Sequence, residues 1–285
     1  MKLAVVTLTQ EVKTTVPVAL LSGTFAERLE KAARLGYDGV ELMALRPQEL
    51  SPQAIREQVA ALGLEVAAIA SGAIAMADKL WLLASPEVSQ RAVARLHALI
   101  DFAAAVGAPL VTIGGFRGRL ASLRSAGGPE DWKEAGIRGL IEILRVAAGK
   151  GAEQGVRLVL EPLNRYETDI VQNVDEGLAL IESVGHPNLG LLLDTFHVNI
   201  EEPSLYDCFR RAMAAGRLWH VHLGDSNRLP PGQGHTDFAG IVAALRESGY
   251  QGYLSAELLA RPDPDTAAAA TIEHMRGLVE RWLTL

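Results

Sequence analysis

With 285 residues, of which 49% are hydrophobic and 21% charged, the chain can bury a large core and is not disordered. Its formal net charge of −7 argues against a protein built mainly to hold nucleic acid, because phosphate binding needs a basic face. The one cysteine, Cys208, excludes an intrachain disulfide and is typical of a reducing compartment. No apolar run approaches the ~20 residues of a membrane helix, and the first residues predict a strand rather than a signal peptide. We expect a cytoplasmic protein that does not associate with membranes.

Eight short aliphatic runs, typical of buried parallel strands, recur along the chain. They occupy residues 3–8, 39–43, 64–70, 109–115, 157–161, 189–194, 218–223 and 252–257. Helical patterns lie between them, and this alternation implies parallel strands joined by right-handed crossovers. Eight such units predict an α/β fold in which residues 1–285 form a single domain, a closed (β/α)8 TIM barrel. An open doubly wound sheet is the alternative, because one misassigned strand would leave seven.

Several predicted helices have recognisable ends. The first begins at a capping box made by Thr24 and Glu27 and ends at Gly36. A serine followed by a proline starts two more helices, at Ser51 and at Ser85.

Two connections are long enough to wall or cover the active site of a barrel, residues 71–84 and 117–129. The chain is predicted to end in a helix from about residue 266 to residue 285.

Four ionisable side chains come at the ends of the last four predicted strands. They are Glu161, Asp194, His222 and Glu257. Active sites of parallel barrels lie at the carboxyl ends of the strands, so these side chains should meet at one rim. Each alone could be an ion-pair partner or a buried histidine. Together they have the composition of a divalent-metal site, because buried charges must be paired or bound to metal. His220 points to the same side of its strand as His222 and could support it from behind.

These residues stand in four motifs: EPLNRYE at residues 161–167, DTFH at 194–197, HVHLGDSNR at 220–228, and Glu257. In order and spacing the motifs resemble the D-tagatose 3-epimerase family, ketose 3-epimerases that belong to the xylose-isomerase-like TIM barrels. The similarity extends over nearly the whole chain. It implies a metal-dependent isomerase, a sugar epimerase of carbohydrate metabolism, that acts on a small-molecule ketose or keto-sugar acid. It also implies a homodimer or homotetramer.

The resemblance assigns roles to individual residues. Those that would bind one divalent cation, manganese or cobalt in the first place and magnesium as a further candidate, are Glu161, Asp194, His222 and Glu257. Those that would hold the C1–C2 end of the substrate are Glu167, His197 and Arg228.

The implied chemistry suits these residue types. Epimerising a carbon beside a ketone requires removing its proton and returning one on the opposite face. That needs two acid/base groups across the substrate, which Glu161 and Glu257 would provide, and a Lewis acid to stabilise the enediolate. His197 and Arg228 would add hydrogen-bond donors where the oxyanion develops. No redox cofactor is expected.

The sequence departs from the neutral-sugar members of the family after the fourth strand. Arg117 and Arg119 place two guanidinium groups near the rim, where a substrate carboxylate or phosphate would pair with them. They could equally be solvated loop charges or pair with local acids. The segment also resembles epimerases of keto-sugar acids such as 5-keto-L-gluconate, so our hypothesis is an anionic substrate held by Arg117 and Arg119. A second departure is Leu258, where family members often carry proline.

Other reactions fit the same barrel. An aldose–ketose isomerase, such as hydroxypyruvate isomerase, would move hydrogen between C1 and C2, and an inosose dehydratase would eliminate water from a keto-inositol. A DNA-repair endonuclease would need three metals and more ligands, and a binding module without activity would not need two bases. Glu41, at the end of the second strand, is interpreted as part of a structural ion pair.

Overall fold

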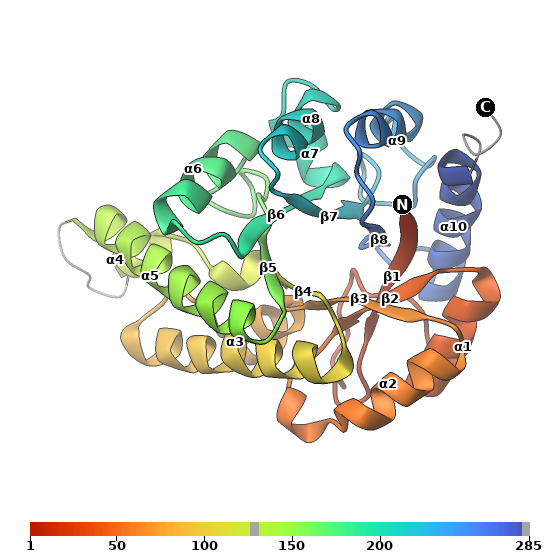
Figure 1. The fold of residues 1–285 in the computed structure, drawn as a ribbon, viewed down its shortest axis with the longest axis horizontal. Helices are drawn as coiled ribbons and strands as arrows, with labels where there is room; N and C mark the ends of the chain where they lie inside the picture. Colours follow the sequence, from red (N-terminus) through yellow and green to blue (C-terminus); the bar gives the residue numbers. More distant parts are fainter. Residues whose placement is uncertain (126–130, 281–285) are drawn as a thin grey trace.

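Eight parallel strands close into a barrel in the computed structural model, which describes residues 1–125 and 131–280 (Figure 1). The strands are β1 Lys2–Leu8, β2 Gly39–Met43, β3 Glu65–Ala70, β4 Leu110–Ile113, β5 Arg157–Leu160, β6 Leu189–Asp194, β7 Leu218–Leu223 and β8 Tyr253–Ala256. Each strand pairs with the next along the chain, and β8 pairs with β1 to close the sheet. The predicted (β/α)8 TIM barrel is confirmed, and the open-sheet alternative is wrong.

The strand ends decide where the predicted site residues lie. β5 and β8 each end one residue earlier than predicted, so Glu161 and Glu257 are the first residues beyond their strands. Asp194 is the last residue of β6, and His222 is the last but one of β7. The two residues lie opposite each other in the register of the sheet. β4 is shorter than the predicted run 109–115, because the 3-10 turn η3 (Gly115–Arg117) takes up its end.

Helices surround the strands on the outside of the barrel (Figure 1). They are α1 Phe25–Leu35, α2 Pro52–Ala61, α3 Pro86–Val106, α4 Ala121–Ser125, α5 Trp132–Glu153, α6 Val174–Val184, α7 Thr195–Glu201, α8 Asp207–Ala214, α9 Phe238–Glu247 and α10 Pro264–Glu280, with the short turns η1 Pro47–Glu49 and η2 Ile74–Asp78. The predicted capping box is present, because the Glu27 carboxylate accepts from the Thr24 N–H at 2.7 Å while the Thr24 side chain accepts from the Glu27 N–H. Gly36 ends α1 at a φ of 88°. Ser51 caps α2, whereas Ser85 precedes α3 without a capping hydrogen bond.

The end of the chain and one long connection are described in part. Helix α10 starts at Pro264, and residues 281–285 of the predicted last helix lie outside the described residues. Of the predicted connection 117–129, residues 117–125 include helix α4, and residues 126–129 lie outside. None of the helices in the described ranges is both long and apolar enough to span a membrane.

The barrel interior changes from apolar to polar along the strands. An apolar layer made by Ala68, Leu110, Val159 and Leu192 packs inside the barrel. Side chains two residues apart on a strand point to the same face. The next inward-facing positions after Val159 and Leu192 are therefore those of Glu161 and Asp194, which puts both carboxylates at the carboxyl end of the barrel.

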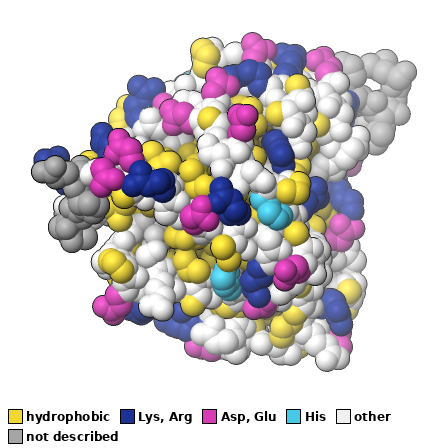
Figure 2. All heavy atoms as spheres, turned by 60° about the vertical axis from the view of Figure 1, so that its left-hand side comes forward, with side chains coloured by type: hydrophobic (Ala, Val, Ile, Leu, Met, Phe, Trp, Pro, Cys, Tyr) yellow, Lys and Arg dark blue, Asp and Glu magenta, His cyan; other side chains and the backbone are white. Residues whose placement is uncertain are grey.

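The surface face shown in Figure 2 carries charged side chains of both signs, with hydrophobic side chains between them. Such a mixed face differs from the single-sign basic surface that phosphate binding requires.

Candidate active site

The four residues predicted as metal ligands come together at the carboxyl ends of β5 to β8. Glu161, Asp194, His222 and Glu257 each offer one ligand atom, and these atoms all lie within 4.8 Å of one another. All four residues are buried, the most accessible being Glu257 at 9%. Three carboxylates and one imidazole therefore share an enclosed space, and such oxygen and nitrogen donors suit a divalent ion.

Several polar atoms of this cluster have no hydrogen-bond partner, namely Glu161 Oε1, Asp194 Oδ2 and His222 Nδ1. His222 Nδ1 lies 3.7 Å from Glu161 Oε1 and 3.3 Å from Glu257 Oε2. A buried polar atom that lacks a partner costs about 1–3 kcal/mol. A cation among these atoms would satisfy all of them together, so the residues present fit a divalent metal ion.

Backbone segments lie against two of the carboxylates from outside the cluster. The second oxygen of Asp194, Oδ1, accepts from the Phe196 N–H at 2.8 Å and so caps helix α7. Glu161 lies against the backbone just after β4, where a Cβ added at Gly114 would meet Glu161 Oε2 at 2.2 Å. A glycine at position 114 is thus required for the close approach of this carboxylate.

Crowding of buried acids shifts the pKa values of the cluster. Burial and, after it, the charge of Glu161 raise the pKa of Asp194 to about 7. Burial also raises the pKa of Glu161. The nearby His222, 3.7 Å away, opposes this rise, and the charge of Glu257 adds to it. For His222, burial disfavours the charged imidazole, but the carboxylates of Glu41 and Glu257 outweigh it and raise the pKa well above the usual range. Without a cation, the cluster holds extra protons at neutral pH.

We expect metal binding to release protons and to weaken as the pH falls, because the ion needs deprotonated carboxylates and a neutral imidazole. The sign for the metal-free protein follows from Asp194, whose native pKa of about 7 lies above the unfolded value of about 3.9. The native state then binds more protons than the unfolded state, so the free energy of unfolding should fall as the pH rises between these two values. The raised pKa of His222 acts in the same direction at higher pH.

Two measurements check this expectation. Urea unfolding of the metal-free protein between about pH 5 and pH 8 should show the fall in stability. Calorimetric titration with Mn²⁺ in two buffers of different ionisation enthalpy should show proton release. A metal affinity that does not change with pH over this range would contradict the expectation.

Arg228 provides a fixed cation beside the cluster. Its Nη1 donates to Glu167 Oε1 at 3.0 Å, and its Nη2 lies 3.9 Å from Glu257 Oε2. The guanidinium also lies over the ring of Phe196, 4.9 Å from the ring centroid. Burial alone would lower the pKa of Arg228, but Asp194 and Glu257 raise it above its usual value. Arg228 therefore stays charged at every pH at which the protein would work.

His197 presents a hydrogen-bond donor toward the cluster. Its Nδ1 accepts from the Asn164 backbone N–H at 3.3 Å, and the Asn164 side-chain amide lies 2.8 Å from the same nitrogen. A neutral imidazole that accepts at Nδ1 carries its proton at Nε2. That Nε2 has no hydrogen-bond partner and lies 3.8 Å from Asp194 Oδ2 and 3.9 Å from Glu161 Oε1. Burial and the charge of Arg228 lower the pKa of His197, which favours this neutral donor form.

Asn164 links these side chains, and sequence reasoning missed its role. Its amide nitrogen also donates to Glu167 Oε1 at 3.1 Å, and its Oδ1 accepts from the Tyr166 N–H at 3.0 Å. The amide thereby joins His197 to the pair formed by Glu167 and Arg228. The sequence signal for Asn164 is only its place in the motif at residues 161–167, three residues after Glu161.

The loop after β7 is organised around the buried carboxylate of Asp225. The backbone N–H groups that donate to this carboxylate belong to Ser226, Gly232, Gly234 and Thr236. Arg228 has a φ of 60°, in the left-handed region that non-glycine residues rarely adopt, and its N–H donates to the Asp225 carbonyl at 2.7 Å. The loop thus holds Arg228 in a conformation that it would not adopt by itself.

A cavity of about 290 Å³ lies over the cluster. Its lining comes from Thr112 of β4 and from the connections that follow β1, β3, β4, β5, β7 and β8. The lining residues are Pro17, Val18, Ser71, Gly72, Ala75, Met76, Thr112, Gly114, Gly115, Glu161, Leu163, Glu167, Arg228, Glu257 and Leu259. Arg228 is the one cation among these described residues. Apart from Arg228 and the three glutamates, the lining residues are uncharged, and most of them have small or apolar side chains.

Arg117 and Arg119 are not part of this lining, and the structure corrects the expectation for Arg117. Its side chain is fully buried, and its guanidinium donates to four backbone carbonyls, those of Glu161 at 2.7 Å, Ile170 at 3.0 Å, Val171 at 3.1 Å and Gly114 at 3.5 Å. Burial lowers its pKa to about 10, which still leaves it charged at neutral pH. Arg119 is exposed. Arg117 therefore fastens the segment after β5 instead of facing a substrate anion.

A sequence model of the xylose isomerase-like TIM barrel family matches residues 29–278. The chain belongs to this family. It is 30% identical over 256 residues to an L-ribulose 3-epimerase of Methylomonas sp. strain DH-1, over 87% of this chain and 82% of the relative. It is 34% identical over 237 residues to an L-ribulose 3-epimerase of Mesorhizobium japonicum, over 80% of this chain and 73% of the relative. A solved structure of an L-ribulose 3-epimerase, 25% identical, matches with a TM-score of 0.78 over 98% of this chain and 95% of the other.

These findings confirm the predicted resemblance to ketose 3-epimerases among the xylose isomerase-like TIM barrels.

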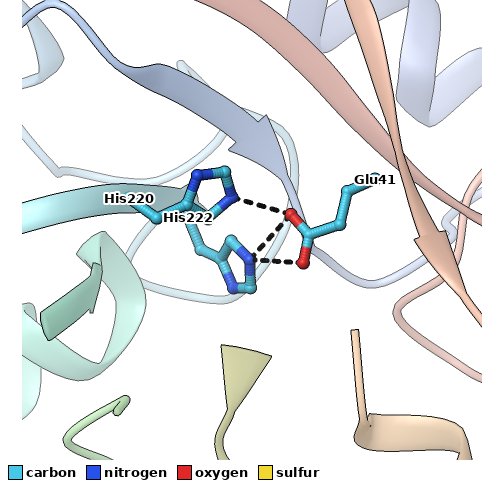
Figure 3. A group of neighbouring side chains, drawn as sticks. All are labelled: Glu41, His220 and His222. Atoms are coloured by element: carbon cyan, nitrogen blue, oxygen red, sulfur yellow. Dashed lines mark hydrogen bonds and ion pairs between the residues drawn. The ribbon is translucent and has the colours of Figure 1, made fainter. Parts of the chain in front are cut away.

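An ion pair is predicted for Glu41, but the sequence does not reveal its partners. The structure pairs its carboxylate with His220 and His222 (Figure 3). Glu41 therefore forms the predicted ion pair, but with a residue of the metal cluster.

Proposed function

We propose that this chain is a divalent-metal-dependent epimerase, an isomerase that inverts the carbon next to the ketone of a ketose. The observation that carries the proposal is that two buried carboxylates, Glu161 after β5 and Glu257 after β8, border one cavity beside the metal cluster. A reaction that removes a proton from one face and returns one to the other needs two such groups. The relatives named as 3-epimerases support the same reaction class.

Glu161 and Glu257 share the proton transfers in this proposal. When bound by Glu161, Asp194, His222 and Glu257, the metal ion supplies a Lewis acid that makes the hydrogen beside the ketone more acidic. One glutamate takes that proton from the substrate carbon, and the other returns a proton to the opposite face. Each glutamate ends the reaction in the protonation state from which the reverse reaction starts, so one arrangement serves both directions.

His197 and Arg228 stabilise the negative charge that develops on the substrate oxygens. The His197 Nε2–H has no partner in the protein and points toward the cluster, and the Arg228 guanidinium adds a fixed positive charge. Glu167 holds Arg228 at 3.0 Å and offers an acceptor for a substrate hydroxyl. Donors that are in place before the charge appears cost no reorganisation during the reaction.

The composition of the cavity supports a neutral ketose as the substrate. Arg228 is already paired with Glu167, and the other described lining residues carry no positive charge with which a substrate carboxylate or phosphate could pair. An anionic group would have to enter a site with several carboxylates at a net electrostatic cost. L-ribulose, the sugar in the names of two relatives, is the first ketose to test.

The test is proton NMR in D₂O with L-ribulose and a panel of other neutral ketoses. We expect the hydrogen at C3 to be replaced by deuterium as the C3 epimer forms. A chelator should stop both processes, and added Mn²⁺ or Co²⁺ should restore them. Deuterium at C1 or C2 with an aldose product would overturn the proposal in favour of an isomerase, and loss of water would favour a dehydratase.

Some finer attributes are also part of the proposal: manganese or cobalt as the metal, a single domain, a homodimer or homotetramer, and a cytoplasmic location. The oxygen and nitrogen donors of the cluster support the choice of metal. The one cysteine, Cys208, which is buried as a free thiol, supports a reducing compartment. The family resemblance supports the oligomer, which light scattering would distinguish from a monomer.

A further inference from the structure

Glu41 reaches across the barrel from β2 to two histidines of β7 (Figure 3). Its Oε2 lies 2.8 Å from His220 Nε2, and its Oε2 and Oε1 lie 3.1 and 3.2 Å from His222 Nε2. None of the three residues is more than 1% exposed. β2 and β7 are not neighbours in the sheet, so this contact passes through the barrel interior.

The positions of the protons follow from the chemistry of the partners. A carboxylate can only accept hydrogen bonds, so the Nε2 of each histidine must carry the hydrogen. When His222 is neutral, its Nδ1 then has no proton and offers a lone pair. This Nδ1 is the atom that faces Glu161 and Glu257, at 3.7 and 3.3 Å. Glu41 thus determines which nitrogen of His222 is available to a cation.

The same contact fixes the direction of the His222 ring. His222 Nδ1 has no hydrogen-bond partner in the protein, so the bonds from Nε2 to Glu41 are what orients the imidazole. His220 donates to the same carboxylate and keeps it in place. Glu41 and His220 are not among the residues that line the cavity, so they act on the cluster from behind.

Glu41, His220 and His222 also satisfy the geometry of a second metal site, since their ligand atoms lie within 4.8 Å of one another. Hydrogen bonds already join the carboxylate to both Nε2 atoms, however, and the group is fully enclosed. These observations favour a hydrogen-bonded support over a second ion.

We propose that Glu41 is a positioning residue for the metal centre. It holds His222 in the tautomer and orientation in which Nδ1 binds the cation, and His220 holds Glu41 in turn. Loss of such a support behind a metal-bound histidine typically weakens metal binding about 10–100-fold. The inference rests on the metal site of the proposed function but not on the identity of the reaction.

The test measures metal affinity instead of turnover. Metal-free wild-type protein, Glu41→Gln and Asp38→Asn are titrated with Co²⁺ and followed by calorimetry and by the visible absorption of the bound ion. Asp38 is a matched control, because it precedes the same strand β2 at the opposite end of the barrel, where it accepts from the Leu3 N–H and pairs with Arg276. We expect one ion per chain throughout, a Kd raised about 10–100-fold in Glu41→Gln, and an unchanged Kd in Asp38→Asn.

An unchanged Kd in folded Glu41→Gln would overturn this inference and leave the proposed function standing. A residue with a merely structural role would lower stability equally with and without metal, and its replacement would therefore leave the Kd unchanged. A fall from two bound ions to one would overturn it in favour of a second metal site. A wild-type protein that binds no ion would overturn the proposed function as well. If Glu41→Gln does not fold, nitrogen NMR of the wild-type histidines with Zn²⁺ bound decides the question. The proposal requires the proton of His222 on Nε2, and a proton on Nδ1 would overturn it.

Discussion

Replacing Glu257 with glutamine is expected to lower kcat for epimerisation by about 10²–10⁴-fold, the usual contribution of one general acid or base. The amide keeps the size of the side chain but cannot take up a proton. Because Glu161 still serves the other face, Glu257→Gln should exchange deuterium into one epimer while forming little of the other. Glu161→Gln should do the same from the opposite epimer. Proton NMR in D₂O reads exchange and conversion in a single experiment.

Metal content has to be measured in both variants, because the two glutamates also belong to the metal cluster. Glu153→Gln, at an exposed position at the end of α5, makes the same chemical change away from the cavity and should keep the full kcat. If Glu257→Gln binds a full equivalent of metal and keeps its kcat, Glu257 has no acid/base role.

Arg117→Met is expected to lower the free energy of unfolding by at least about 3 kcal/mol. Methionine fills much of the space of the arginine stem but donates no hydrogen bonds. The buried carbonyls of Glu161, Ile170 and Val171 would then lose their guanidinium partner, and each such loss costs about 1–3 kcal/mol. Urea denaturation, with the midpoint and the m-value fitted together, measures the change.

Arg119→Met is the matched control, since it removes the same charge two residues along the chain at an exposed position. Its effect should stay within about 0.5 kcal/mol. Equal effects of the two changes would mean that Arg117 is not a buried support. A change of substrate preference between a keto-sugar acid and its neutral ketose in Arg119→Met would bring back the anionic substrate.

The barrel, and the meeting of Glu161, Asp194, His222 and Glu257 at one rim, could be predicted because both depend on local patterns. An aliphatic run that ends in a carboxylate, as at Glu161 and Asp194, places the charged group at the carboxyl end of a buried strand. The helix start at Thr24 likewise depends on residues three positions apart, and the structure contains the predicted capping box. The predicted ends of β5 and β8 lie only one residue beyond the observed ends.

The direction of Arg117 and the partners of Glu41 could not be predicted, because both depend on segments that are distant in the sequence. Arg117 lies in a turn directly after β4, and the path of residues 161–171 decides whether it faces the cavity or the protein interior. Glu41 meets His220 and His222 across the barrel, and such a contact depends on how the strands are staggered around the barrel. Residue type alone shows that a buried charge needs a partner but not which partner it has.

Asp225 has a consequence for the way in which ligands bind. Because backbone N–H groups on both sides of Arg228 converge on this one carboxylate, the loop after β7 is ordered before any substrate arrives. Binding therefore does not have to spend free energy on fixing this segment, a cost that weakens association wherever a loop must be ordered. That free energy remains available to favour the transition state over the bound substrate. Preorganisation, and not closure of this loop, is thus the contribution that the fold makes through Arg228.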